Sequence, residues 1–535
     1  MDVSLALLYA RTVRHLRPSQ AVHRVRLRTQ RAAIRHFPRQ AQRLLERAPV
    51  EVAGWPQTFT PLDALLPWPS PEEVDAGELT LLGEVRALGV PEDWGQHSAP
   101  QLWRYHLHYW DWAWGLIQAA DRPRARTVYE RLLTSWMSQT RLGDGDAWSP
   151  YVVALRAWSW CGQYDALVRG SDADADIVRL LGLHAGYLRA NLELDVGGNH
   201  LIKDLKALIG LAVFFGDDPL GRQALSRLEQ EVARQVLPDG GQFERAPAYH
   251  CQVLADLIDV QELLSGECPG WLAGAVERMR SWLGIVLLPD GTVPLLNDGY
   301  PVPASLLSAL RPGPPAEEGL TLLADTGLAV LRQGTLHVLA DVGLPCPYEL
   351  PAHAHADTLG FLCYTGQRRL VGESGTSTYE AGPARAFERS TAAHSTVEID
   401  GADSTEVWGA FRAARRARPQ LLQAVVENGA SVLSASHDGY RRLPGQPVHT
   451  RTWRLTESSL RVTDEVTGEG EHDLVIRLYD TPSSAVHGAT VELVERTADV
   501  AVGWQHFERS TCLEHTAHGR LPWRFEVELV MQEAT

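Results

Sequence analysis

Residues 351–375 read PAHAHADTLGFLCYTGQRRLVGESG, a passage that combines two histidines, two acidic residues and two apolar runs. Alternate side chains of an extended chain point to the same side, so His353, His355 and Asp357 are predicted to share one face. The apolar run LGFLCY continues as a predicted strand. After the turn residues TGQ, the run RRLVGES is predicted to pair with it and to end at Glu373. The passage therefore predicts a sheet with chemically active side chains along one edge.

A third histidine, His394, opens another strand-like run, HSTVEID. Imidazole nitrogens and carboxylate oxygens are common zinc ligands, so two histidines and a carboxylate on neighbouring strands form a candidate divalent-metal set. One histidine would then remain for the substrate. The spacing alone leaves an alternative, in which His353 and His355 only satisfy the edge of a strand.

The composition is that of a globular protein large enough for two or three domains, with 535 residues, 44% hydrophobic and 22% charged. The six cysteines form no CxxC pair, which argues against a disulfide scaffold or a cysteine-rich zinc site. No run of about 18 apolar residues predicts a membrane span. The run LALLYA at residues 5–10 lacks the flanks of a secretory signal, so we expect a cytoplasmic protein, with the periplasm or cell surface as the alternative.

The charge is unevenly distributed along the chain. Residues 1–47 hold eleven arginines and only two acidic residues, a charge of +9, while the whole chain carries −16. A basic, partly amphipathic arm can contact an anionic membrane surface, a polyanion or the acidic body of its own chain, or it can simply be solvated. No feature predicts a nucleic-acid partner or fixes an oligomeric state.

Periodicity predicts helical hairpins from about Asp121 to Leu288. One helix face is indicated by the i, i+3, i+4, i+7, i+11 spacing of Ile177, Leu180, Leu181, His184 and Leu188. Another is indicated by Leu225, Leu228, Val232 and Val236. The tetrapeptide LPDG, at 237–240 and again at 288–291, ends a helical segment each time. Such repetition is typical of an α/α toroid, whose loops gather at one end and carry binding residues.

Two loops are candidates for that role. Gly197 and Gly198 precede a predicted helix with Asn199 and His200 at its mouth, although Asn199 on its own could be an N-cap. In the second loop, DGGQFERAPAYH leads into a helix whose first turn holds Tyr249, which shares a face with apolar residues and could equally pack in the core.

Tryptophan is abundant, with 17 residues and a cluster in QLWRYHLHYWDWAW at 101–114. Flat aromatic faces suit sugar stacking but more often serve helix packing. Trp148 is the tryptophan that we expect to contact substrate.

Beyond the proline-rich residues 312–319 the period changes from helical to alternating. DLVIRLY, SLRVTDEV and TVELVE alternate apolar and polar residues, with turn residues every eight to twelve positions. We therefore predict a basic helical arm at 1–50, an α/α toroid at 51–311 and an antiparallel β-sandwich at 312–535. The long polar segment 375–397 resembles a loop that lines a site more than a hairpin.

The chain resembles the heparinase II/III-like polysaccharide lyases, which combine an N-terminal α/α toroid with an antiparallel β-sandwich. The resemblance rests on GGNHLIKDLKAL (197–208), DGGQFERAPAYH (239–250), NDGY (297–300), AHAHADTLGF (352–361), GTSTYE (375–380) and FERSTAAHSTV (387–397). The resemblance covers most of the chain. Within the family, the chain looks more like the branch that accompanies capsular or extracellular polysaccharide synthesis.

This resemblance implies roles for individual residues. Asn199 and His200 match the family's residues at the substrate carboxylate, Tyr249 its catalytic tyrosine and His353 its catalytic histidine. A further three residues, His355, Glu373 and His394, match the positions of a structural metal, for which zinc is expected first and calcium second. Glu373 stands where the family often has aspartate. Its side chain is longer than that of aspartate, which alters the geometry of the site.

The implied reaction is β-elimination at a uronic acid of an anionic polysaccharide such as a glycosaminoglycan or alginate. Removing the C5 proton places charge on the carboxylate, which Asn199 and His200 would stabilise. Tyr249 as a phenolate is one candidate base, at a cost of about 1.4 kcal/mol for each unit by which its pKa must fall from about 10. The other candidate is His353, which could instead protonate the leaving O4 atom. Tyr379 and Arg389 are expected to bind the sugar or its charge.

Glu244 is the remaining residue expected to contact substrate. Together with Asp298 it also forms the best pair for an alternative activity, that of a glycoside hydrolase, which needs two carboxylic acids about 5–10 Å apart. A catalytically silent polysaccharide-binding protein is the third alternative.

Overall fold

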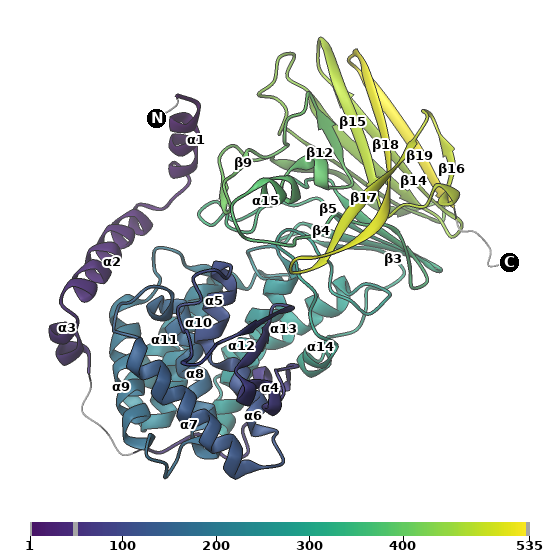
Figure 1. The fold of residues 1–535 in the computed structure, drawn as a ribbon. Helices are drawn as coiled ribbons and strands as arrows, with labels where there is room; N and C mark the ends of the chain where they lie inside the picture. The colour runs from purple at the N-terminus through teal and green to yellow at the C-terminus, as the bar shows by residue number, and fades with distance from the viewer. Residues whose placement is uncertain (1–2, 47–51, 531–535) are drawn as a thin grey trace.

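A computed structural model of the chain describes residues 3–46 and 52–530, which form a helical domain followed by antiparallel sheets (Figure 1). The predicted fold class is confirmed. The predicted boundary between residues 50 and 51 lies outside the described residues. The helices are α1 (Val3–Val13), α2 (Pro18–His36), α3 (Pro38–Leu45), α4 (Pro71–Ala76), α5 (Gln101–Tyr109), α6 (Trp114–Ile117), α7 (Arg122–Gln139), α8 (Pro150–Leu167), α9 (Asp174–Asn191), α10 (Gly198–Phe215), α11 (Asp218–Gln235), α12 (Pro247–Leu264), α13 (Gly270–Val286), α14 (Ala304–Leu310) and α15 (Pro383–Glu388).

The helical domain is built around α10, which packs against α8, α9, α11 and α12. Almost every residue of α10 is buried, because neighbouring helices surround it on all sides. The two helices predicted from periodicity are α9 and α11, and both LPDG turns follow helix ends, after α11 and α13. The loops at one end of these helices face the sheets (Figure 1).

The sheets are antiparallel throughout the described pairings. The strands are β1 (Glu78–Leu81), β2 (Glu84–Ala87), β3 (Gly319–Leu323), β4 (Leu328–Gln333), β5 (Leu336–Asp341), β6 (Phe361–Thr365), β7 (Arg368–Val371), β8 (Val397–Ile399), β9 (Val407–Trp408), β10 (Arg412–Ala413), β11 (Pro419–Glu427), β12 (Ala430–His437), β13 (Val448–Leu455), β14 (Ser459–Thr467), β15 (Glu471–Tyr479), β16 (Val486–Ala489), β17 (Val494–Gly503), β18 (His506–Arg520) and β19 (Trp523–Val530). The three large sheets have the orders β3-β4-β5-β6-β7, β11-β12-β13-β14-β19-β16 and β17-β18-β15-β8.

The first of these sheets joins the two parts of the molecule. Alternate residues of its strands face opposite sides, so one face contributes to the helical core and the other to the sandwich core. The helix-facing set includes Leu328, Val330, Leu339, Leu362 and Tyr364. The sandwich-facing set includes Ala329, Leu331, Val338, Ala340, Phe361 and Cys363. Burial on both faces fixes the sheet against the toroid, and with it the loop between β5 and β6 that carries His353.

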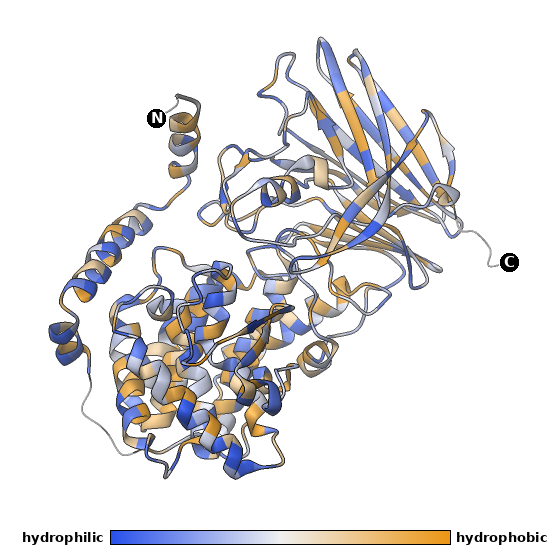
Figure 2. Cartoon of the chain, viewed as in Figure 1, coloured by the Kyte–Doolittle hydropathy of each residue, from blue (hydrophilic) through white to orange (hydrophobic). Residues whose placement is uncertain are grey.

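Figure 2 shows hydrophobic and hydrophilic residues alternating along the long strands, as the period-two pattern requires. The structure corrects two predictions of this kind. Residues 351–360 form turns and irregular backbone rather than a strand, because the short buried loop folds back on itself before β6 begins. The run TVELVE is only partly a strand, since β17 starts at Val494 and residues 490–493 connect it to β16.

The basic arm comprises α1, α2 and α3, which extend along the outside of the toroid and reach the sandwich (Figure 1). Its arginines pair with acidic residues of the body. Arg11 contacts Glu406 at 3.0 Å and Arg24 lies 3.6 Å from Asp195. The sequence suggested several partners for the basic arm, and the structure contains one of these contacts, that between the arm and the acidic body of the same chain. Within residues 3–46 and 52–530, helices of membrane-crossing length and apolarity are absent.

Candidate active site

The first turn of α10 places Asn199 at the junction of the two domains. Gly198 adopts a φ of +59°, and a Cβ atom there would lie 2.5 Å from the Leu350 side chain and 2.6 Å from Glu244, so only glycine fits. The backbone N–H of Asn199 donates to Glu244 Oε1 at 2.7 Å. Because the N-cap of α10 is Gly197, the N-cap alternative for Asn199 does not hold. Its side-chain Oδ1 is buried and has no hydrogen-bond partner among the described residues.

His200 follows on the same turn and is the more open of the two residues. Its side chain is 38% exposed, and Nδ1 lies 3.1 Å from Glu193 Oε2. The imidazole also packs against the Tyr151 ring at a centroid distance of 4.3 Å. A carboxylate at Nδ1 favours the tautomer with the proton on that atom, which leaves a lone pair on Nε2.

His353 lies between two buried carboxylates. Its Nδ1 is 3.0 Å from Asp298 Oδ2, and its Nε2 is 3.2 Å from Glu244 Oε2. Burial lowers the pKa of His353, but the two carboxylates outweigh that effect and raise it to about 9. Glu244 in turn accepts the Asn199 amide, so one carboxylate links the toroid helix to the histidine of the β5–β6 loop.

Asp298, from the NDGY motif, organises the sandwich side of the site. It is fully buried and receives two hydrogen bonds from Arg385, at 2.5 and 2.8 Å. His355 Nε2 contacts the same carboxylate at 2.8 Å. Burial raises the pKa of Asp298, but Arg385 and the two histidines more than compensate and hold it well below its usual range. The preceding residue, Asn297, accepts the His355 backbone N–H at 3.0 Å and so fixes the loop.

Tyr249, on the first turn of α12, contacts His353 and Tyr379. Its ring stacks on His353 at a centroid distance of 3.9 Å, and its hydroxyl lies 2.8 Å from the Tyr379 hydroxyl. Burial and the neighbouring Tyr379, Tyr300 and Asp298 raise the pKa of Tyr249 well above 10, so the ground state is the neutral phenol. The hydroxyl therefore has a polar environment that simple core packing does not require.

Two arginines near α15 have different surroundings: Arg385 lies within the helix, and Arg389 follows its last residue. Arg389 was predicted to bind substrate, but it is 1% exposed and donates to backbone carbonyls, including Ala354 at 2.9 Å. Arg385 is the arginine that contacts the site: it is buried, pairs with Asp298 and lies 4.9 Å from the centroid of the Tyr379 ring. The two arginines are four residues apart in the sequence, so periodicity alone gave no means of distinguishing them.

Trp148 also differs from the prediction. It is 4% exposed, and its ring packs edge-on against His184 and Tyr187 and receives the Arg156 guanidinium at 5.6 Å. Its faces are therefore covered by protein and are not free for sugar stacking. Trp504, in the β17–β18 turn, packs against Tyr379 with ring centroids 4.6 Å apart. The sequence patterns do not indicate this tryptophan.

The predicted metal residues lie together behind His353. His394 Nδ1 contacts Glu373 Oε2, and the His355 and His394 ring centroids are 5.3 Å apart. Burial lowers the pKa of His394, but Glu373 and Asp357 outweigh it and raise the value. As the side chains stand, no three His, Cys, Asp or Glu residues in the described part of the chain have the spacing of a metal site.

Four buried atoms in this group nevertheless lack a hydrogen-bond partner among the described residues. They are His355 Nδ1, Asp357 Oδ1, Glu373 Oε1 and His394 Nε2. Buried polar atoms without partners are costly, and these four are of the types that zinc accepts. The donor chemistry therefore fits a divalent metal, and Asp357 joins the three residues expected from the sequence.

The hydrolase alternative fits this geometry poorly. Glu244 and Asp298 contact opposite nitrogens of one imidazole, so His353 fills the space that a water or glycosidic oxygen would need. Burial raises the pKa of both carboxyl groups, but their charged neighbours lower it by more. For Glu244 the neighbour is His353, and for Asp298 it is mainly Arg385. Neither group is therefore poised to act as a protonated general acid.

Comparison with known proteins agrees with the architecture. Residues 94–311 match the family described as Heparinase II/III N-terminus, and residues 315–528 match Heparinase II/III-like, C-terminal. FtsZ-localized protein C of Caulobacter vibrioides is 28% identical over 417 residues, which cover 74% of this chain and 70% of that protein. Heparin-sulfate lyase of Pedobacter heparinus is 28% identical over 237 residues, 39% of this chain and 36% of that enzyme. A crystal structure of heparinase III superposes with a TM-score of 0.70 at 15% identity, covering 97% of this chain and 92% of that structure.

The fold and the two family matches define a polysaccharide lyase, one of the carbon–oxygen lyases, of the toroid-and-sandwich class. Together the matched segments span most of the 535 residues. The chain belongs to the heparinase II/III family.

Proposed function

We propose that this protein cleaves a uronic-acid-containing polysaccharide by β-elimination, in the metabolism of a capsular or extracellular polymer. The observation that carries the proposal is a single connected group at the domain junction. Asn199 bonds to Glu244, Glu244 contacts His353, and His353 stacks on Tyr249, which meets Tyr379. These residues come from separate segments of both domains, and they match the residue types that the reaction needs.

Binding of the uronate carboxylate is assigned to Asn199. The reaction moves charge onto that carboxylate when the C5–H bond breaks, so neutral donors fixed in place beforehand stabilise the transition state. Asn199 is 2% exposed and held by its backbone bond to Glu244, which makes it a rigid donor. The positively charged His353 adds a favourable field from behind.

Proton transfer is assigned to His200 and Tyr249. Both ring nitrogens of His353 face carboxylates, so this histidine has no free lone pair to accept a proton. In the part of the chain that the structure describes, His200 has its Nδ1 against Glu193 and no hydrogen-bond partner at Nε2, which suits a general base for the C5 proton. Tyr249, a neutral phenol, can donate its proton to O4 as the C4–O4 bond breaks and the C4–C5 double bond forms.

The test is a screen of uronate-containing polysaccharides, glycosaminoglycans and alginate among them, followed by ultraviolet absorbance of the 4,5-unsaturated product. We expect absorbance to rise with at least one polymer and to be lost in His200→Gln. New reducing ends without absorbance would indicate hydrolysis, and binding without either signal would indicate a sugar-binding protein. Either result would overturn the proposal.

We further propose that His355, Asp357, Glu373 and His394 hold one divalent metal, most readily zinc. The support is the set of four buried atoms without partners and their ligand chemistry. When bound, the metal would tie the β5–β6 loop to the segments after β7 and before β8 and so stiffen the support of His353. Elemental analysis of the purified protein should then find about one metal per chain.

A further inference from the structure

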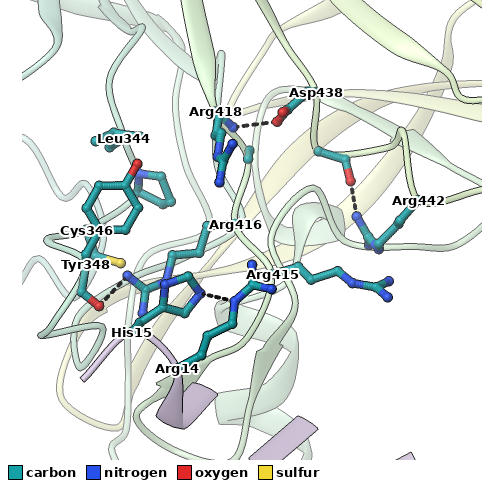
Figure 3. Close-up of a pocket in the computed structure, with 13 residues that line it drawn as sticks. Arg14, His15, Leu344, Cys346, Tyr348, Arg415, Arg416, Arg418, Asp438 and Arg442 are labelled. Atoms are coloured by element: carbon teal, nitrogen blue, oxygen red, sulfur yellow. Dashed lines mark hydrogen bonds between the residues drawn. The ribbon is translucent and has the colours of Figure 1, made fainter. Parts of the chain in front are cut away.

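A basic cavity lies where the arm meets the sandwich, and none of the catalytic side chains line it. It has a volume of about 170 Å³ and is formed by four separate segments. These are the turn after α1, the β5–β6 loop, the segment between β10 and β11, and the segment after β12. Figure 3 shows the side chains that line the cavity.

The charge of this cavity is strongly one-sided. Its lining contains one aspartate and five arginines, namely Arg14, Arg415, Arg416, Arg418 and Arg442. The aspartate, Asp438, accepts the backbone N–H of Arg418 at 2.9 Å rather than a guanidinium. Such a concentration is unexpected in a chain with a net charge of −16, so it is not a general property of the surface.

Several of these guanidinium groups lack an anionic partner. Within the described residues, Arg14 and Arg418 form no ion pair with a carboxylate. Arg416 donates Nη1 to Pro347 and Tyr348 carbonyls, at 3.0 and 2.8 Å, but its Nε and Nη2 are buried without partners. Burial and then Arg416 and Arg14 lower the pKa of His15, which is the expected response to a positive environment.

Arg416 is the costly member of this group, because two of its buried nitrogens have no partner among the described residues and no carboxylate offsets the repulsion from the other arginines of the cavity. An oxyanion with several acceptor oxygens would remove that cost. Guanidinium forks match the geometry of sulfate and phosphate oxygens, and charge-assisted hydrogen bonds are stronger than neutral ones. The remaining arginines already have partners, since Arg415 lies 3.6 Å from Glu406 and Arg442 donates to backbone carbonyls.

We propose that this arginine cavity is a second binding site, for a doubly charged oxyanion of the sulfate or phosphate type. The group can be a free anion or a sulfo group on a saccharide chain. Its recognition does not depend on the catalytic residues, so the site stands whether or not the proposed lyase reaction is correct. Binding would connect the arm to the β5–β6 loop, because the cavity draws residues from both.

The experiment is calorimetric titration of the full-length protein with inorganic sulfate and with inorganic phosphate, against sodium chloride of equal ionic strength. The test variant is Arg14→Ala/Arg418→Ala, because both side chains are exposed at the rim and neither supports the backbone. The matched control is Arg26→Ala/Arg28→Ala, which removes the same charge from exposed positions of α2 outside the cavity. We expect at least about tenfold weaker binding in the test variant and wild-type binding in the control.

Two further ligands identify the source of the group. A sulfated heparan oligosaccharide that binds more tightly than inorganic sulfate, and loses that advantage in the test variant, indicates a carried sulfo group. Inorganic anions that bind more tightly than the oligosaccharide indicate a free anion. The proposal is overturned if no anion binds beyond the chloride control, if the test variant binds like wild type, or if the control variant is weakened equally. Urea unfolding of both variants confirms that each is folded.

Discussion

Replacing Tyr249 with phenylalanine tests the chemical assignment most directly. The substitution keeps the ring that stacks on His353 at 3.9 Å and removes only the hydroxyl that meets Tyr379 at 2.8 Å. One hydrogen bond between partly buried hydroxyls contributes about 1 kcal/mol to stability. A proton donor to the leaving oxygen contributes at least ~10²-fold to the rate. We therefore expect a large loss of turnover with a small loss of stability.

The same hydrogen bond supplies a matched control. Tyr379→Phe removes the other hydroxyl of the pair together with its 3.5 Å bond to the Asp298 carbonyl, so its stability cost should be at least as large, while Tyr249 keeps its own proton. Initial rates come from the ultraviolet absorbance of the unsaturated product, and free energies of unfolding come from urea titrations. Equal rate losses in the two variants, or near-normal turnover in Tyr249→Phe, would refute the assignment of Tyr249 as the acid.

Three other predictions concern the toroid, the metal and the sandwich core. Asn199→Ala should lower kcat by ~10²- to 10³-fold with little change in the urea midpoint, because the helix contact uses the backbone amide, and a stability loss at normal rate would contradict this role. His394→Ala should purify with less than one metal per chain, whereas the wild-type protein should hold about one. Removing the metal with a chelator should lower the melting temperature of the wild-type protein. A wild-type protein that contains no metal and does not respond to chelator would exclude the site. Arg451 and His449 outweigh burial and hold the pKa of Asp464 at about 2, so this carboxylate stabilises the fold above its unfolded pKa of about 3.9 and loses that contribution as pH falls toward 2. The loss should be about 2–3 kcal/mol, and Asp464→Asn should be less stable at pH 7 but show a flatter stability curve between pH 4 and pH 2 in urea titrations.

Short-range patterns in the sequence determined the fold class and the segments in which the candidate site residues lie. Helical spacing over 177–188 and before Pro238, and alternation in DLVIRLY and SLRVTDEV, reflect which side of each element is buried. Glycines at 197 and 198 marked the mouth of α10, since the positive φ there excludes other residues. Such signals depend on neighbours a few positions away, so they can be read without knowing the tertiary contacts.

Only the tertiary structure decided which side chains meet. His353 contacts Glu244 and Asp298, which are 109 and 55 residues away, and Arg385 reaches Asp298 across 87 residues. No local pattern contains that information, because these contacts are created when the sheet from β3 to β7 packs one face on the helices. For the same reason Trp148 turned out to be a core residue: whether an aromatic face is open or covered depends on the neighbours that the packed domains bring to it, rather than on its own segment.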